Sequence, residues 1–235
     1  MFFSCSNLKE IHFSSFNTSN VTNMCGMFNS CSSLTELNLS NFNTNNVNDM
    51  MAMFNCCCSL KKINLSNFQT HNVTKMHEMF HGCGSLEVID LCHFNTHNVT
   101  KMNDMFRRCS SLKKIDLSNF NNTKVTTMCW MFYECLSLQE INLLNFNTNN
   151  VTDMSLMFAQ CRKLEEINLS NFNTKNVTNM KRMFYRCASL KKIDISNFNL
   201  NNVTEIDGMF SECSDELKMK IKEQIKDIKE EAFHN

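Results

Sequence analysis

Residues 131–154 read MFYECLSLQEINLLNFNTNNVTDM, and close copies of this stretch recur along most of the chain. Nine cysteines follow one another at steps of 26 residues, from Cys5 to Cys213, and nine phenylalanines keep the same step from Phe2 to Phe210. No insertion or deletion interrupts this spacing. A strict period of this length is typical of solenoids, in which each repeat forms one coil and buries its apolar face against neighbouring coils.

Each repeat divides into two halves with different apolar periods. In residues 34–40, Leu37 and Leu39 alternate with polar residues, and this alternation predicts a short strand. In residues 47–57, apolar residues recur at intervals of three and four, which predicts a short amphipathic helix that begins at an N-cap threonine in most repeats. We therefore predict an α/β fold, a right-handed leucine-rich-repeat solenoid of about eight strand-plus-short-helix coils with parallel strands.

The two ends of the repeat array differ from its middle. After Cys213, Ser214 suits a helix N-cap, and the residues that follow form one apolar helical stripe. The stripe consists of Leu217, Ile221, Ile225, Ile228 and Ala232. We predict a solenoid over residues 1–213 and a C-terminal amphipathic capping helix over 214–235, with a partner-binding helix as the alternative. Because the first repeat begins in mid-unit, we expect a frayed first coil or a solenoid truncated at its N-terminus.

Charge and composition exclude several classes of function. Lys plus Arg and Asp plus Glu both number 23, so the formal net charge is zero, which argues against a nucleic-acid partner. No apolar run approaches the roughly 20 residues of a membrane span, so we expect no membrane insertion. The repeats contain no phosphate-binding loop, no nucleophile elbow and no distinct Ser, His and acid set. We therefore expect a non-enzymatic protein without catalytic residues or a cofactor.

The repeat unit resembles that of the BspA-type leucine-rich-repeat surface proteins. The shared pattern is M-F-x-x-C-x-S-L-x-x-I-x-L-S-N-F-N-T-x-N-V-T-x-M, and residues 131–154 depart from it only at Leu144, which replaces Ser. The resemblance covers residues 1–213. Ordinary leucine-rich repeats carry Asn where this chain has Phe42 and its equivalents, so their Asn ladder does not transfer. The resemblance implies a surface-displayed or secreted protein that acts in adhesion or in binding a protein or glycan ligand.

Other features favour a different location. The chain carries 14 cysteines and opens without the basic and apolar segments of a signal peptide. Six N-x-T sequences recur at the repeat period, which is too close for a glycan on each. An intracellular, cytoplasmic protein-interaction scaffold is therefore the alternative hypothesis, because a reducing compartment suits free thiols.

The cysteines and histidines are the candidates for metal or redox chemistry. The nine periodic cysteines share one inward position, and we expect a reduced, buried ladder rather than disulfides. His77 and His81 lie four residues apart on the predicted helix, a spacing that suits a shared metal. His71 and His97 occupy one position in neighbouring repeats and would stack. No third ligand accompanies either pair in register, and other repeats carry Asn, Lys or Ser there, so we predict no metal site.

Two faces of the solenoid are candidates for a binding surface. The outward positions of the predicted strands carry a monotonous polar row without aromatic residues, from Asn38 to Asp194. The predicted helix face varies more from repeat to repeat, and its residues include types that dominate binding hot spots. We predict that a partner binds there, at Trp130, Tyr133, Leu156, Arg107, Arg108, Arg182 and Arg186.

Overall fold

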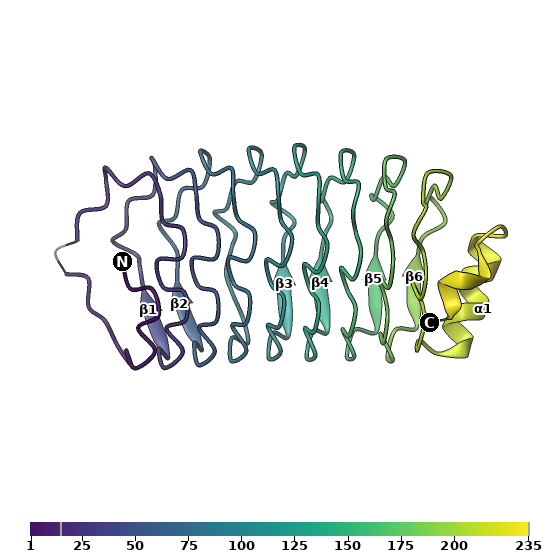
Figure 1. Ribbon diagram of the computed structural model, residues 1–235, viewed down its shortest axis with the longest axis horizontal. Coiled ribbons are helices and arrows are strands. Elements are labelled where there is room, and N and C mark those ends of the chain that lie inside the picture. Colours follow the sequence, from purple (N-terminus) through teal and green to yellow (C-terminus); the bar gives the residue numbers. More distant parts are fainter. Residues whose placement is uncertain (15, 235) are drawn as a thin grey trace.

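Successive repeats lie side by side in the computed structural model, which describes residues 1–14 and 16–234 (Figure 1). Six short strands recur at the repeat period and pair in parallel as β1–β2, β3–β4 and β5–β6. Their bounds are Glu36–Asn38 (β1), Lys62–Asn64 (β2), Lys114–Asp116 (β3), Glu140–Asn142 (β4), Glu166–Asn168 (β5) and Lys192–Asp194 (β6). Each strand residue lies opposite its equivalent one repeat on, as Leu37 lies opposite Ile63. The solenoid with parallel strands is therefore confirmed.

Stacked phenylalanines form the centre of the core. From Phe2 to Phe210, the rings of equivalent residues lie 5.4–5.8 Å apart between centroids and are within 16° of parallel. Phe132 in the middle of this row has no exposed surface. Because each ring contacts one ring before it and one after it, every interior coil is held by both of its neighbours.

The prediction of a short helix in each coil is wrong. In residues 47–57 the chain forms successive tight turns, and Ala52 and Cys56 have φ angles of 52° and 57°. Positive φ at such closely spaced residues is incompatible with a right-handed helix. The N–H of Phe54 instead donates to the carbonyl of Met79 in the next coil at 2.9 Å, and the N–H of Cys57 donates back to Phe54 at 3.2 Å. Apolar intervals of three and four suit these turns as well as they suit a helix.

The predicted N-cap threonines also have a different role. The N–H and the Oγ1 of Thr74 both donate to the carbonyl oxygen of Asn48 in the preceding coil, at 2.9 and 3.1 Å. Thr178 does the same with Thr152. These threonines therefore tie one coil to the next rather than starting a helix.

The periodic cysteines from Cys31 to Cys213 form a ladder of buried free thiols, as predicted, whereas Cys5 in the first coil is exposed, so the prediction is wrong there. Among the described residues, eight of these thiols donate to the carbonyl of the phenylalanine 29 positions earlier, at 3.1–3.3 Å. Burial raises the pKa of the Cys109 thiol to about 12, so the donor proton stays on sulfur at neutral pH. Every cysteine in the described ranges is free.

The last coil is covered by the C-terminal segment, though not by one continuous helix. Helix α1 spans Asp215–Gln224, and the Oγ of Ser214 accepts from the N–H of Leu217 at 3.2 Å, as an N-cap does. The backbone becomes extended at Ile225, and a 3₁₀ helix, η1, follows at Glu230–Phe233. The N–H of Phe210 donates to Ala232 at 2.7 Å, and the ring of Phe233 stacks 6.0 Å from that of Phe210. This segment therefore takes the place of a further coil.

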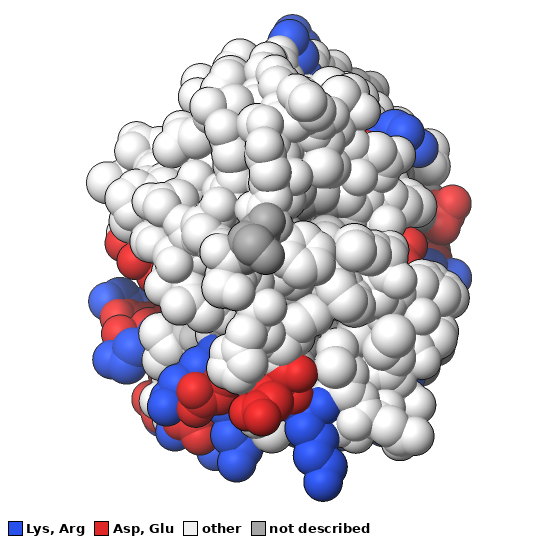
Figure 2. All heavy atoms as spheres, turned by 90° about the vertical axis from the view of Figure 1, so that its left-hand side faces the viewer, with Lys and Arg blue, Asp and Glu red and all other residues white. Residues whose placement is uncertain are grey.

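The other end of the solenoid has an uncharged centre. Figure 2 shows this end with its charged side chains gathered mainly towards one edge. Phe3 is 63% exposed, and Phe2, Leu8 and Ile11 are half-buried. The first coil contains no strand within the described ranges, but the N–H of Phe2 still donates to Met27 at 2.9 Å. Its backbone is therefore joined to the second coil.

Candidate recognition surface

One face of the solenoid, which we call the turn face, carries four positions in each coil whose residue type differs strongly between repeats. In each coil it consists of four positions, represented by Cys129, Trp130, Tyr133 and Glu134. Because the coils stack in register, equivalent positions form columns along the solenoid. The Trp130 column runs through Asp104, Trp130, Leu156 and Arg182, and the Tyr133 column through Arg107, Tyr133, Ala159 and Tyr185.

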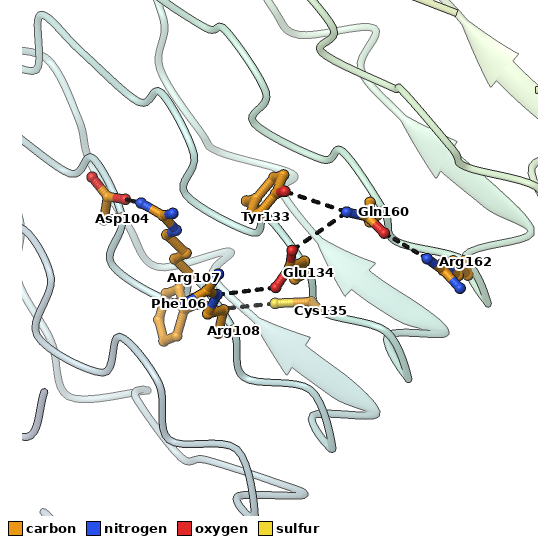
Figure 3. Close-up of polar contacts among 9 residues, drawn as sticks. All are labelled: Asp104, Phe106, Arg107, Arg108, Tyr133, Glu134, Cys135, Gln160 and Arg162. Atoms are coloured by element: carbon orange, nitrogen blue, oxygen red, sulfur yellow. Dashed lines mark hydrogen bonds and ion pairs between the residues drawn. The ribbon is translucent and has the colours of Figure 1, made fainter. Parts of the chain in front are cut away.

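Three of the predicted binding residues form an aromatic and cationic cluster. The Arg107 guanidinium carbon lies 4.5 Å from the ring centroid of Trp130 and 5.3 Å from that of Tyr133. The two rings meet edge to face at 4.7 Å. An Arg107 Nη1 contacts Asp104 Oδ1 at 3.0 Å, so the cation carries its own counter-ion (Figure 3). The cluster is therefore held in place before any partner arrives.

Arg108 joins this cluster only indirectly. Its Nε contacts Glu134 Oε2 at 3.0 Å (Figure 3). The Nε2 of Gln160 donates to Tyr133 Oη at 3.3 Å and to Glu134 Oε1 at 3.4 Å. Glu134 thus neutralises Arg108, while Gln160 links that pair to the aromatic cluster.

Arg182 and Arg186 belong to a second cluster, around Tyr185. Their guanidinium carbons lie 5.3 and 4.9 Å from the Tyr185 ring centroid. The Tyr185 hydroxyl donates to Glu212 at 2.8 Å, and Arg186 Nε contacts the same carboxylate at 2.7 Å. Sequence reasoning missed Tyr185. The signal was its column, because Tyr185 and Tyr133 are the chain's two tyrosines and occupy equivalent positions.

Leu156 occupies the position between the two clusters. It follows Trp130 and precedes Arg182 in their column, and it is half-buried. All three have positive φ, 62°, 53° and 53°, which costs a non-glycine residue about 1–3 kcal/mol. Their N–H groups donate to carbonyl oxygens of the next coil at 2.9–3.0 Å, and these backbone hydrogen bonds hold the chain in this conformation. The predicted binding residues therefore lie along one strip.

The strand face has most of its charge paired between coils. Lys62 contacts Glu36 at 2.9 Å, and equivalent pairs follow along the face. These are Lys114 with Glu140 at 2.5 Å and Lys192 with Glu166 at 3.3 Å. The polar row inside them is structural, since the Oδ1 of Asn38 accepts from the N–H of Ser40 at 3.1 Å and its equivalents do likewise.

Two apolar side chains nonetheless protrude from the strand half of the coils. Val88 is 64% exposed and Leu144 is 68% exposed. Shallow grooves lie between the coils, and one of them is lined by Val88, β3 and β4. This face is therefore the competing candidate for a recognition surface.

The four candidate histidines do not come together as a metal site. His77 and His81 lie on turns, so the helical-face argument for them is wrong, and burial lowers the pKa of each. Both Nδ1 atoms are buried without a hydrogen bond. His71 is exposed, and His97 Nδ1 lies 2.6 Å from Asn95 Oδ1. Across residues 1–14 and 16–234, no group of three His, Cys, Asp or Glu side chains could hold a metal ion.

Helix α1 is also short for a membrane segment. Over the part of the chain that the structure describes, no helix has the length and apolar character needed to cross a bilayer.

Comparison with solved structures identifies the fold. A leucine-rich repeat protein from Bacteroides ovatus ATCC 8483 matches with a TM-score of 0.54 and 20% identity, over 83% of this chain and 45% of that one. This chain therefore spans less than half the length of that protein. Leucine-rich repeat proteins from T. pallidum (TM-score 0.46, 20% identity, 92% and 81% covered) and from Eubacterium ventriosum ATCC 27560 (0.49, 19%, 91% and 55%) also match. No curated protein matches.

A family model matches nearly the whole chain, over residues 1–114, 57–142 and 107–225. These segments include both clusters and reach into the covering segment that follows the last coil. The family carries a description other than BspA-type, so the likeness of the repeat to BspA-type proteins remains a resemblance. The chain belongs to the family described as Mycoplasma protein of unknown function, DUF285.

Proposed function

We propose that this protein is a non-enzymatic protein-recognition module that binds its partner through the turn face, centred on Trp130. The observation that carries the proposal is the Arg107–Trp130–Tyr133 cluster, whose members contact one another at 4.5–5.3 Å. Trp, Tyr and Arg are the residues most enriched in binding hot spots. The leucine-rich-repeat fold supports the same function, since repeats of this kind present extended binding surfaces.

The rigidity of the cluster favours binding. Arg107 is fixed by two rings and by Asp104, and the Trp130 backbone is fixed by its N–H donating to Ser155 at 2.9 Å. Side chains that are already ordered lose little conformational entropy when a partner covers them. The strand face lacks such a cluster among the described residues, and its exposed apolar side chains, Val88 and Leu144, are aliphatic.

Selection of binding peptides tests the choice of face. Random-peptide phage would be selected on the immobilised chain, and each clone would then be retested on Trp130→Ser and on the strand-half variant Leu144→Ser. We expect most clones to lose at least ten-fold in affinity on Trp130→Ser and to be unaffected by Leu144→Ser. Clones that show the reverse dependence would refute the proposed face.

For the location and biological role, we propose surface display in adhesion, on the strength of the BspA-type resemblance. A protein or glycan on a neighbouring cell or matrix is then the ligand. An intracellular scaffold is the second candidate, and the free thiols favour it because they suit a reducing compartment. Protease shaving of intact source cells separates the two. Repeat peptides released without lysis support the surface protein, and peptides released only after lysis support the scaffold.

A further inference from the structure

We infer that the turn face from Trp130 to Arg182 binds an extended peptide segment that carries an apolar residue followed, two positions later, by an acidic one. The inference rests on the proposed recognition function and adds the chemistry of the partner. It comes from one unneutralised arginine, from its uncharged neighbours and from the spacing of the coils.

Arg182 differs from the other three predicted arginines in its counter-ion. Arg107 contacts Asp104, Arg108 contacts Glu134 and Arg186 contacts Glu212, each within 3.0 Å. None of the ion pairs found between the described residues includes Arg182. Its positive charge is therefore available to a partner.

The position of Arg182 is nevertheless fixed. Its guanidinium lies over the Tyr185 ring at 5.3 Å, and its side-chain stem passes Gly208. A Cβ at Gly208 would lie 3.3 Å from Arg182 Cγ, so the glycine leaves room for the stem. The neighbours of Arg182 in its column, Leu156 and Gly208, are both uncharged. Lys181 has no ion pair either, but Asp207 holds the equivalent position in the next coil, so Lys181 is left out of the inference.

The residues that precede Arg182 in its column favour an apolar residue in the partner. Trp130 and Leu156 are the two preceding members of the column, and both are partly exposed. A carboxylate that reaches Arg182 therefore has an aromatic and an aliphatic surface beside it. A basic partner would meet the like charge of Arg182 instead, at a cost.

Coil spacing gives the register of the partner. On the turn face the backbones of neighbouring coils are hydrogen-bonded to each other, which sets them about 4.8 Å apart. The backbone midpoint between Trp130 and Leu156 is therefore about 7 Å from the backbone of Arg182. Residues on one face of an extended peptide recur every two positions, or about 6.8 Å. An apolar side chain seated between Trp130 and Leu156 thus places the residue two positions on opposite Arg182.

Trp130 is the only tryptophan in the chain, so its fluorescence reports binding at this strip directly. The probe is the acetylated and amidated peptide Gly-Thr-Leu-Thr-Glu-Thr-Gly, compared with versions in which Glu is replaced by Lys or Leu by Ser. We expect the first peptide to change the fluorescence and to bind at least about five-fold more tightly than either comparison peptide. Arg182→Gln should remove the preference for Glu over Lys, while Lys61→Gln, a matched loss of an exposed cation on the strand side, should retain it.

The outcomes separate this inference from the proposed function. Equal binding of the Glu and Lys peptides, or no response to any of the three, overturns the acidic partner. Recognition at the turn face still stands in that case if the phage clones depend on Trp130. Clones indifferent to Trp130→Ser refute the proposed function, whatever the peptides do.

Discussion

Replacing Phe132 with Ala tests the stacked core. The ring is fully buried and lies 5.4 Å from Phe106 and 5.5 Å from Phe158, so the substitution removes two ring contacts and leaves a cavity between them. Phenylalanine-to-alanine changes in cores cost about 3–5 kcal/mol. Each stacked aromatic pair contributes about 0.5–1.5 kcal/mol beyond its buried area. Because two pairs are lost at once, we expect a value near the upper end, about 5 kcal/mol.

Phe3→Ala is the matched control. It deletes the same atoms from a ring that is 63% exposed, so we expect a loss below about 1 kcal/mol. The assay is urea unfolding at equilibrium, followed both by far-UV circular dichroism and by Trp130 fluorescence. Coincident curves from the two probes justify a two-state analysis. Equal losses for Phe132→Ala and Phe3→Ala would refute the stacked-coil account of stability.

Three further predictions concern the buried histidines, the cysteine thiols and the repeat period. Burial lowers the pKa of His77 and His81, so near the unfolded pKa of about 6.5 the unfolded chain binds more protons than the folded chain. The free energy of unfolding therefore falls as the pH drops from the unfolded pKa to the lower folded pKa. The double variant His77→Gln, His81→Gln should show a smaller decline in urea midpoint between about pH 7.5 and about pH 5.5. In the native protein, iodoacetamide should label exposed Cys5 and Cys58 within minutes and leave buried Cys83 and Cys109 unmodified, as measured by peptide mass spectrometry. Rapid labelling of the buried pair would contradict the buried thiols. Deleting residues 53–78 removes one whole period and joins Ala52 to Met79, so we expect a folded, shorter solenoid with a loss of about 1–4 kcal/mol, whereas deleting only 53–65 should abolish cooperative unfolding.

The core could be predicted from sequence because the period repeats without interruption. Each inward position, such as Phe132 or Cys135, is the same kind of residue in coil after coil, and all such positions must face the same interior. The conformation of the turn half could not be predicted in this way. A glycine indicates the positive φ at Gly26, but Trp130 adopts nearly the same angle with no indication in the local sequence. The backbone hydrogen bonds between coils impose that angle on Trp130.

The candidate site was only partly predictable for a related reason. Because equivalent positions of successive repeats form columns, Arg107 lies one coil before Trp130 and Tyr133, which explains why the three residues cluster. It does not determine which carboxylate each arginine reaches, since that depends on side-chain rotamers and on neighbours such as Gly208. The predicted C-terminal stripe does pack on the last coil, but the helix predicted over 214–235 ends at Gln224. Further on, the carbonyls of Glu231 and Ala232 accept backbone hydrogen bonds from the last coil, which no local pattern in the sequence indicates.

Separation of the core from the turn face explains how one fold can carry different binding surfaces. The backbone at Trp130, Leu156 and Arg182 is held by N–H groups that donate to the next coil, not by their side chains. A residue exchanged at these positions therefore changes the exposed chemistry while the ladder and the phenylalanine stack stay intact. The strain of positive φ is shared by almost any non-glycine residue there, so it discriminates little between side chains. Residues at these positions can then be selected for binding a partner, without a change in the core. A cluster such as Arg107, Trp130 and Tyr133 is therefore evidence of binding rather than of folding.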